Sequence, residues 1–333
     1  MNAEEFNGKR LLIIHNGGEK QGLLYQNICN NLGMTLDQLP DKPNEKAFGK
    51  IAGRLHLRFY ERVLENYYKN AVDALSNNYD YILVIRGEYT PVNAVKYLRK
   101  KNPNAKMVLY MWDSIRNNHG IEKKWDLFDK VYSFDRADYL AHKEEIGFIP
   151  LFYCEEYINE LDQNAEKKYD IAFIGTAHGD RAKIVNQVER ICKKHGLAMY
   201  KFLYCPHTLV YFYNRLFNKD YRYVKKKDLS FALKPQKEIY EIYSQTNCVL
   251  DVEIKTQTGL TMRTMDILGL KKKLITTNAD IINYDFYNPN NILVIDRNHV
   301  KLKKSFLNTP YEELDPEIYN KYSMKSWLLQ LLS

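Results

Sequence analysis

Two short segments of the chain combine glycine, hydroxyl and charged side chains in a pattern that suits the binding of an anion. The first is FIGTAHGDR (173–181), an apolar run that passes through a glycine-containing turn into a helical pattern. Small residues let the main chain approach a ligand closely, and the first N–H groups of a helix are free to bind an anion. The candidate ligand-binding residues of this turn are Gly175, Thr176, His178 and Arg181. The alternative is an ordinary turn in which Asp180 caps the helix and Arg181 lies in solvent.

The second segment is DVEIKTQTGLTMRTMDILGLKKKLITTN (251–278), an apolar strand followed by a glycine and a helical pattern. Gly259 interrupts the chain after the strand, so a helix that begins near Leu260 has free N–H groups. Arg263 and Asp266 are three residues apart and therefore share a face of that helix. We expect the turn to hold phosphate and the acid to accept hydrogen bonds from a ribose diol. The alternative is an exposed ion pair between the two residues, worth about 0.2–0.5 kcal/mol.

The composition indicates a soluble globular protein. Its 333 residues suit two domains, and 45% hydrophobic with 27% charged residues is typical of folded chains. Apolar runs are far shorter than the roughly 20 residues of a membrane span, and no signal peptide is recognisable, so we expect a cytoplasmic protein. The net charge of +8 suits a phosphate-bearing substrate, a nucleic acid or an anionic membrane surface. The five cysteines form no CxxC pair, which predicts buried free thiols and no metal site.

Short apolar runs alternate with helical patterns along the chain, which is typical of βαβ units and parallel sheets. Strands of the first half are expected at 10–15, 79–87, 105–113, 130–135 and, less regularly, 148–153. A polar stretch at 155–168 interrupts this pattern, which restarts at residue 169. Later strands are expected at 248–254, 272–277 and 291–296, and a terminal helix at 316–333. Because the strands are continuously apolar, helices should cover both faces of each sheet.

We therefore predict an α/β protein with two Rossmann-like, doubly wound domains that face a cleft. The first domain would span residues 1–157, with a C-terminal helix at 313–333 returning to it, and the second would span 158–312. Open α/β sheets bind ligands beyond the carboxyl ends of their strands. In the first domain this rule selects the loops HNGGEKQG, RGEYTP and WDSIRNNHG, at 15–22, 86–91 and 112–120.

The segment GLTMRTMDILGLKKKLITTN (259–278) resembles the C-terminal donor site of GT-B glycosyltransferases, where a glycine turn opens a helix whose acid holds the ribose. YDIAFIGTAHGDR (169–181) resembles the start of the second domain in CgeB-like and group-1-like glycosyltransferases that build surface polysaccharides. The resemblance implies transfer of a sugar from a nucleotide-sugar donor, expected to be a UDP-sugar, to a hydroxyl of a growing surface glycan. It implies neither a further cofactor nor a metal, and the chain has no DxD sequence. The ribose acid of the family is usually Glu and is Asp266 here.

The resemblance also implies roles for individual residues. Arg263 would face the donor phosphates, Asp266 the ribose, and Gly259 would let the main chain approach. Other contacts to the phosphates or to the transferred sugar would come from Lys255, Thr258 and Thr261.

In the first domain the resemblance implies acceptor binding and, for an inverting enzyme, a general base. His15 directly follows the first strand, and imidazole titrates near neutral pH, so it is the expected base. Gly17 and Gly18 would leave room beside it for the acceptor. Asp113 and Glu88 lie at the ends of two other strands and are the competing bases.

Two segments, 50–75 and 200–234, mix basic and aromatic residues. Such segments suit an anionic lipid surface beside a lipid-linked glycan acceptor, which would place the protein at the inner face of the membrane. They also suit single-stranded nucleic acid, but no RRM, KH or OB signature is present, so we expect no nucleic-acid partner. Packed amphipathic helices are the expectation for 50–75. For 200–234, packed helices and a membrane or acceptor role both stay open. Two other functions fit the same fold, namely nucleotide-sugar 2-epimerase and non-catalytic binding of a nucleotide sugar or glycan.

Overall fold

The chain forms two compact units, each built around its own sheet. The computed structural model describes residues 3–43, 58–75, 78–118, 120–159, 161, 165–255 and 258–333. Unit 1 comprises Met1–Pro150 and Lys325–Ser333, and unit 2 comprises Leu151–Met324. Both sheets are parallel and carry helices, which confirms the prediction of two Rossmann-like α/β domains. The contacts assign residues 151–157 and 313–324 to unit 2, whereas we had expected them in the first domain.

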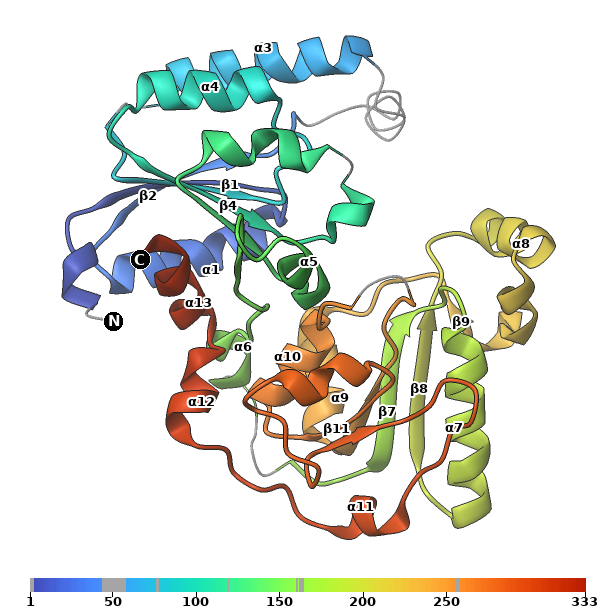
Figure 1. Cartoon of the computed structure of the whole chain (residues 1–333). Helices are drawn as coiled ribbons and strands as arrows, with labels where there is room; N and C mark the ends of the chain where they lie inside the picture. Colours follow the sequence, from blue (N-terminus) through green and yellow to red (C-terminus); the bar gives the residue numbers. More distant parts are fainter. Residues whose placement is uncertain are drawn as a thin grey trace. The chain divides into compact units, whose positions relative to one another are not determined.

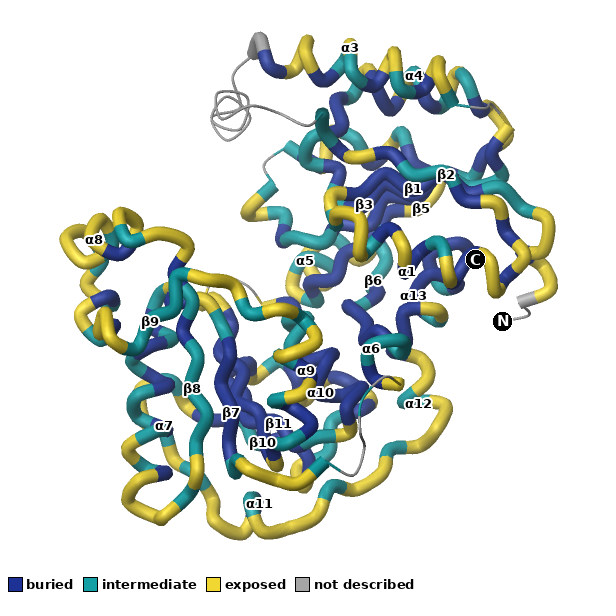
Figure 2. Tube along the Cα trace, turned by 180° about the vertical axis from the view of Figure 1, so that it is seen from behind, coloured by how far each residue is buried: buried dark blue, intermediate teal, exposed yellow. Residues whose placement is uncertain are grey.

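Unit 1 has a six-stranded parallel sheet in the order β2-β1-β3-β4-β5-β6, one of the two common doubly wound orders. Its strands are β1 (Arg10–His15), β2 (Thr35–Pro40), β3 (Tyr81–Ile85), β4 (Lys106–Met111), β5 (Lys130–Ser133) and β6 (Gly147–Phe148). Its helices are α1 (Gly18–Asn31), α3 (Arg58–Ala74), α4 (Val92–Lys101), α5 (Arg136–Ala141) and α13 (Met324–Leu332), with 3₁₀ turns at Ala3–Phe6, Ile115–Asn117 and Ile121–Leu127. Figure 1 shows α3 and α4 on one face of this sheet and α1 and α13 on the other. The central strands are therefore buried on both sides, as Figure 2 shows in dark blue.

Unit 2 has a second six-stranded parallel sheet, in the order β12-β11-β10-β7-β8-β9. Its strands are β7 (Tyr169–Thr176), β8 (Met199–Tyr204), β9 (Leu229–Ser230), β10 (Thr246–Asp251), β11 (Lys273–Thr276) and β12 (Ile292–Val294). Its helices are α6 (Glu155–Asn159), α7 (Arg181–His195), α8 (Thr208–Phe217), α9 (Gln236–Ser244), α10 (Met262–Gly269), α11 (Lys304–Asn308) and α12 (Pro316–Lys321), with 3₁₀ turns at Lys219–Tyr223, Lys226–Asp228 and Ala279–Asn283. Counted within the unit, the order is 6-5-4-1-2-3, which is that of dinucleotide-binding folds. The strand order reverses between β7 and β10, and ligands of such sheets bind there, beyond the carboxyl ends.

Several elements differ from those expected from the sequence. Strands β2 and β8 were not predicted, because TLDQLP and MYKFLY mix polar with apolar residues and are only partly buried. Of the expected strand at 148–153, only Phe148 is part of a strand, β6. The expected terminal helix is two helices separated at Tyr322–Ser323, where Ser323 forms a bridge to Tyr153. Of the basic helix expected over 45–75, residues 45–57 lie outside the described residues.

The side chains of α13 complete the core of unit 1. The indole of Trp327 lies among three aromatic rings, with centroid distances of 6.3 Å to Tyr25, 5.1 Å to Tyr110 and 6.2 Å to Trp112. Leu328 on the same helix is fully buried. All five cysteines of the chain are buried and unpaired, which confirms the prediction of free thiols.

Candidate functional site

Asp251 organises the carboxyl end of β10 in unit 2. Its side chain is fully buried, so its charge needs partners that replace water. Its carboxylate accepts hydrogen bonds from Arg263 Nη1 (2.6 Å), Thr261 Oγ1 (2.7 Å) and Thr264 Oγ1 (2.8 Å). The Thr261 hydroxyl in turn accepts the main-chain N–H of Thr264 and so caps α10. Asp251 therefore ties the first turn of α10 to the end of the strand.

This arrangement corrects the roles expected for Arg263 and Asp266. The helix begins at Met262 behind a capping Thr261, rather than near Leu260 with free N–H groups. Asp266 is buried and accepts a hydrogen bond from Tyr240 Oη (2.6 Å), and burial raises its pKa to about 6. Arg263 pairs with Asp251. Arg263 and Asp266 therefore form neither an exposed ion pair with each other nor an open ligand surface. Both side chains hold α10 against the sheet, because each is directed to a partner inside unit 2.

The end of β7 and the turn that follows it contain two glycines, and no side chain caps the next helix, α7. A Cβ atom at Gly175 would lie 2.8 Å from Arg263 Nη2, so this glycine makes room for the Arg263 guanidinium. Gly179 adopts φ +55°, a left-handed conformation that favours glycine. Asp180 does not cap α7; its carboxylate pairs instead with Arg297 Nη1 (2.8 Å) and Lys255 Nζ (3.2 Å). The first N–H groups of α7 are thus without a side-chain acceptor.

Arg181, the first residue of α7, is a partly buried cation whose hydrogen bonds to described residues go to main-chain oxygens. Its Nε donates to the carbonyl of Val252 (2.7 Å), and its Nη1 lies 3.5 Å from the carbonyl of Thr176. Among the residues that the structure describes, it forms no ion pair. Burial lowers its pKa and the nearby Arg263 lowers it further, whereas the carboxylates of Asp251 and Glu253 act in the opposite direction. The expected alternative, with Arg181 in solvent, is therefore wrong.

Other predicted donor-site residues lie around this turn. Thr176, His178, Lys255 and Thr258 are exposed, and Lys255 has 59% of its side chain in solvent. The carbonyl of Thr258 accepts a hydrogen bond from Asn278 Nδ2 (2.8 Å), and Gly259 next to it is buried. The structure thus brings Thr176, His178, Arg181 and Lys255 together at the carboxyl edge, and places Gly259 and Thr261 at the start of α10.

Sequence reasoning missed the ion pairs that support this edge. Arg297, which follows β12, donates to Glu253 Oε1 (2.5 Å) and to Asp180 Oδ1 (2.8 Å). Glu253 is buried and also accepts the hydroxyl hydrogen of Thr277. The signal was present in the sequence VIDRN (294–298), because a charged pair directly after an apolar strand lies at the carboxyl edge of a parallel sheet.

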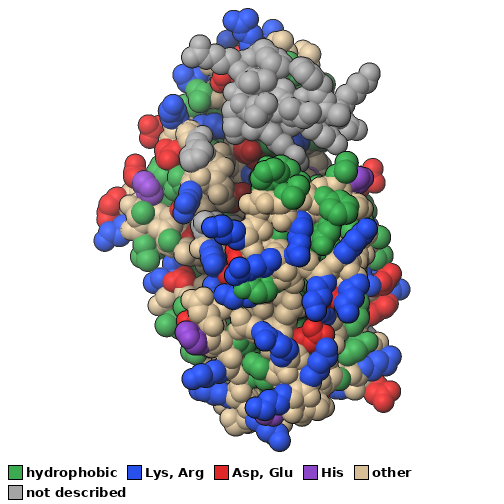
Figure 3. Space-filling view, turned by 90° about the vertical axis from the view of Figure 1, so that its right-hand side faces the viewer, with side chains coloured by type: hydrophobic (Ala, Val, Ile, Leu, Met, Phe, Trp, Pro, Cys, Tyr) green, Lys and Arg blue, Asp and Glu red, His purple; other side chains and the backbone are tan. Residues whose placement is uncertain are grey.

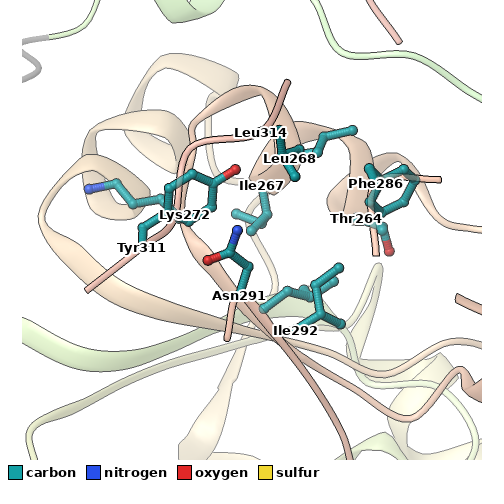
Figure 4. Close-up of a pocket in the computed structure, with 10 residues that line it drawn as sticks. Thr264, Ile267, Leu268, Lys272, Phe286, Asn291, Ile292, Tyr311 and Leu314 are labelled. Atoms are coloured by element: carbon teal, nitrogen blue, oxygen red, sulfur yellow. The ribbon is translucent and has the colours of Figure 1, made fainter. Parts of the chain in front are cut away.

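A small cavity lies beneath α10 among the described residues of unit 2. Figure 4 shows a small cavity there, with a volume of about 20 Å³. Its lining residues are Thr264, Ile267, Leu268, Lys272, Leu274, Phe286, Asn291, Ile292, Tyr311 and Leu314. That volume holds about one water molecule. This cavity is therefore too small for a nucleotide.

Unit 1 has an open pocket of about 850 Å³ at the carboxyl ends of β1 and β2. It is lined by His15, Asn16, Gly18, Glu19, Gly22, Leu23, Gln26, Gln38, Pro40, Asp41, Lys42 and Pro43. Asp41 is 1% exposed, and its Oδ2 has no hydrogen-bond partner among the described residues. Its main chain is fixed by hydrogen bonds to the carbonyl of His15 (3.0 Å) and from Tyr68 Oη (2.9 Å). Burial raises the pKa of Asp41 to about 6, so the carboxylate is a proton acceptor near neutral pH.

His15 lines this pocket, but both of its ring nitrogens are already engaged. Gln38 Nε2 donates to the carbonyl of Gly22 (3.1 Å), which turns Gln38 Oε1 toward His15 Nε2 (2.9 Å). Nε2 therefore carries the hydrogen, and Nδ1 accepts the main-chain N–H of Gly17 (3.1 Å). Burial lowers the pKa of the ring below its usual value. His15 in this geometry has no free lone pair for a substrate proton, contrary to the role expected from the sequence.

The two competing bases, Glu88 and Asp113, share one arginine. Arg86 Nη2 lies 3.0 Å from Glu88 Oε2 and 3.7 Å from Asp113 Oδ2. Asp113 Oδ1 also accepts the N–H of Ser114 (2.9 Å), which fixes the turn after β4. Arg86 itself has φ 70°, a conformation rare for non-glycine residues that marks a constrained turn at the end of β3. Both carboxylates thus have structural partners.

Gly17 and Gly18 form the turn between β1 and α1. Gly18 adopts φ +68° and lines the pocket, and no side chain caps α1 behind it. Gly17 contributes its N–H to His15, so of the two predicted acceptor-binding glycines only Gly18 faces the open pocket.

Two further features concern the part of the chain that the structure describes. No group of three or more His, Cys, Asp or Glu side chains there is arranged to hold a metal ion. No helix in these ranges has the length and apolar character to cross a membrane.

Several solved structures are similar to the chain. A Glycosylation Associate Protein (Gap123) complex from Streptococcus agalactiae aligns with 81% of this chain and 54% of its own, at 12% identity and a TM-score of 0.43. The catalytic domain of starch synthase IV from Arabidopsis thaliana, bound to ADP and acarbose, aligns over 98% and 94% of the two chains at 7% identity and a TM-score of 0.49. UDP-GlcNAc 2-epimerase from Neisseria meningitidis, bound to UDP-GlcNAc, aligns over 97% and 99% at 10% identity and a TM-score of 0.48.

The chain spans about half the length of the first of these proteins. No protein-family model matches the sequence, and no curated protein matches it either. Because the three TM-scores are below 0.5, the functional assignment rests on the geometry of the two sites.

Proposed function

We propose that the chain is a glycosyltransferase and that the diphosphate of its nucleotide-sugar donor binds at the carboxyl edge of unit 2. Arg181 is the observation that supports this most strongly. Its guanidinium is partly withdrawn from water beside the point where the strand order reverses, and no described carboxylate forms an ion pair with it. Guanidinium groups bind phosphate through paired, charge-assisted hydrogen bonds. An incoming diphosphate would supply the missing negative charge.

Neighbouring groups at this edge suit the same ligand. The uncapped start of α7 offers main-chain N–H groups and the positive end of a helix dipole. Thr176 and His178 are exposed in the turn before it, and Lys255 reaches the same place through its ion pair with Asp180. These cations would stabilise the leaving diphosphate without a metal ion. We therefore expect full activity in the presence of EDTA, and loss of activity on chelation would contradict this mechanism.

The acceptor would bind in the pocket of unit 1, which is large enough for sugar residues. In a single displacement, the acceptor hydroxyl oxygen bonds to the anomeric carbon while the bond from that carbon to the diphosphate oxygen breaks. The bonding electrons leave with the diphosphate, and the hydroxyl proton passes to a base. We assign that base to Asp41, because its Oδ2 has no hydrogen-bond partner among the described residues and its pKa of about 6 keeps it ionised at neutral pH. The acceptor we expect is a surface glycan or its lipid-linked form, and the donor a UDP-sugar.

Calorimetry with UDP, GDP, CMP and TDP tests the donor site. We expect the Arg181→Ala variant to bind the preferred nucleotide about 10–150-fold more weakly, the effect of losing a charge-assisted hydrogen bond of about 1.5–3 kcal/mol. Arg190→Ala is the matched control, because Arg190 lies on the same helix and is exposed. Unchanged affinity in the Arg181→Ala variant, or no nucleotide binding tighter than about millimolar by the wild type, would refute the site.

Product analysis separates glycosyl transfer from the two other functions. A transferase releases nucleotide and extends an acceptor, whereas an epimerase converts the nucleotide sugar with no acceptor present. A binding protein would bind the donor and show no turnover with any glycan of an acceptor array. We expect transfer, because a pocket with an unpaired carboxylate in unit 1 accompanies the cationic edge of unit 2.

A further inference from the structure

Helix α8 carries a stripe of large apolar side chains on its outer face. The residues of this α8 stripe are Leu209, Phe212, Tyr213, Leu216 and Phe217, with 71%, 50%, 64%, 79% and 73% of each residue exposed. Their spacing of i, i+3, i+4, i+7 and i+8 is that of a helix face which normally packs against a core. The buried face of the helix is small, and Tyr211 is its buried residue. The most apolar side of α8 therefore faces solvent.

The packing of α8 shows that this exposure is built into the fold. The Tyr211 ring lies 6.0 Å from that of Tyr221, and Arg215 Nη1 donates to the carbonyl of Tyr221 (3.1 Å). These contacts anchor the inner side of the helix to the 3₁₀ turn at Lys219–Tyr223 and orient the stripe outward. Tyr213 and Phe217, one turn apart, contact each other with ring centroids at 4.9 Å. Exposed apolar patches of this kind on soluble proteins mark interaction surfaces.

A basic segment overlaps the end of the stripe and continues beyond it in the sequence. Residues 215–227 contain one acid, Asp220, and six exposed cations. The cations are Arg215, Lys219, Arg222, Lys225, Lys226 and Lys227. The Lys226 ammonium lies 5.6 Å from the centroid of the Phe212 ring, so the basic segment borders the stripe. Figure 3 shows apolar side chains and Lys and Arg side chains together on this face.

We infer that α8 is a membrane-docking helix that inserts its stripe into the interface of an anionic lipid bilayer. Interfacial helices bury an apolar face by roughly 5–10 Å at the headgroup boundary, while basic residues bind anionic headgroups. Charge complementarity favours lipid over a protein partner, because the cores of protein interfaces are depleted in lysine. Long lysine side chains also reach from a buried position to the headgroups.

Docking through α8 would present the carboxyl edge of unit 2 near the membrane. The last residue of β8, Tyr204, pairs with Thr176, the last residue of β7, and α8 begins four residues after Tyr204. A lipid-linked acceptor and the proposed donor site would then meet at the same surface. The docking itself needs no substrate, so its test is independent of the proposed function.

Vesicle co-sedimentation of the whole chain without substrate tests the inference. The probes are phosphatidylcholine vesicles with and without phosphatidylglycerol. We expect binding to the anionic vesicles, weakened by salt. The double variant Leu216→Ser/Phe217→Ser should lose at least about tenfold in partitioning, and Lys225→Glu/Lys226→Glu should lose about tenfold or more. The matched controls are Lys303→Glu/Lys304→Glu, two adjacent exposed lysines of unit 2, and Ile282→Ser, a single apolar residue with 55% exposure.

Three outcomes would overturn the inference. The wild type could fail to bind anionic vesicles, or the α8 variants could bind as well as the controls. The wild type could also be an oligomer that Leu216→Ser/Phe217→Ser converts to a monomer in light scattering, which would make α8 a contact between copies of the chain. Circular dichroism on each variant checks folding, and exposed substitutions of this kind usually change stability by no more than about 0.5 kcal/mol.

Discussion

Asp41 lies in an environment that is unfavourable for a carboxylate. It is buried beside a pocket, one of its carboxylate oxygens is unpaired among the described residues, and its pKa is raised to about 6. Removing a carboxylate from water without hydrogen-bonding it destabilises the fold. Such strain is commonly retained where a group acts on a ligand, because perturbed pKa values cluster at functional sites. His15 differs from Asp41, because both of its ring nitrogens are hydrogen-bonded.

We expect Asp41→Asn to lower kcat by about 10²–10⁴-fold, the usual effect of removing a general base. Nucleotide affinity should be unchanged, because the proposed donor site lies in unit 2. His15→Asn is the matched control in the same pocket and should lower kcat less than about fivefold, since no ring nitrogen is free to accept a proton. The measurement is steady-state kinetics with nucleotide affinity by calorimetry. The reverse order of the two variants would restore His15 as the base.

The pH dependence of the wild type gives a second readout of Asp41. The base acts in its ionised form, so kcat should fall as pH drops through about 6 and stay level above it. Asp41→Asn should lose this limb of the profile. A wild-type profile that is flat between about pH 5 and 7.5 would exclude a base with this pKa.

At the scale of elements, substitution of two acids of unit 2 should change stability in opposite ways. Asp251 contacts the first turn of α10, and Asp266 lies on α10 itself. Asp251→Asn leaves Arg263 without its ion pair and should destabilise the protein by about 3–5 kcal/mol. Asp266→Asn keeps an acceptor for Tyr240 Oη and removes a buried carboxylate whose pKa is raised to about 6. Because the pKa is raised, the folded state binds this proton more tightly than the unfolded state. The stabilisation from the protonated carboxyl is therefore complete below about pH 4 and is lost as pH rises through 6. We therefore expect Asp266→Asn to be neutral or stabilising by up to about 3 kcal/mol at pH 7.

Urea unfolding at pH 4.5 and pH 7 measures this contrast. The difference between Asp266→Asn and the wild type should shrink at the lower pH, where the wild-type carboxyl is protonated. Equal destabilisation by both variants at pH 7 would show that Asp266 serves as a charged partner for Arg263.

The same helix shows what sequence patterns can and cannot predict. The continuous apolar runs in the strands predicted at 10–15, 79–87 and 105–113 identified β1, β3 and β4, because burial on both faces leaves an unambiguous pattern. Spacing also placed Arg263 and Asp266 on one face of a helix. The spacing did not reveal that this face points into unit 2. The ion pair of Arg263 with Asp251 decides that orientation, and the sequence assigned Asp251 only to a strand. Asp41 was missed for a similar reason, because its burial depends on β2, whose mixed sequence gives no strand signal.

At the scale of the whole molecule, unit 1 depends on a helix that is remote from it in sequence. Trp327 on α13 is 1% exposed among Tyr25, Tyr110 and Trp112. We expect Trp327→Ala to destabilise unit 1 by about 3–5 kcal/mol, the usual effect of truncating a buried large aromatic residue. Leu140→Ala is the control, because Leu140 is 51% exposed in the same unit.

The chain supplies a specific probe for this unit. All three of its tryptophans, Trp112, Trp125 and Trp327, belong to unit 1, so tryptophan fluorescence follows the unfolding of that unit alone. The midpoint by fluorescence should shift in Trp327→Ala, while nucleotide affinity, a property assigned to unit 2, should hold. A shift that is no larger than that of Leu140→Ala would show that α13 contributes little to this core.

The discontinuity of unit 1 reverses the order in which the two units become complete during translation. Residues 151–324 form unit 2 as one uninterrupted run, so a ribosome delivers the whole of unit 2 before it delivers α13. At about 5–20 residues per second, that run occupies roughly 10–35 s. Throughout this interval the face of the nascent unit 1 sheet that includes Tyr110 has no Trp327 to cover it. All residues of unit 2 are thus synthesised before the core of unit 1 is complete.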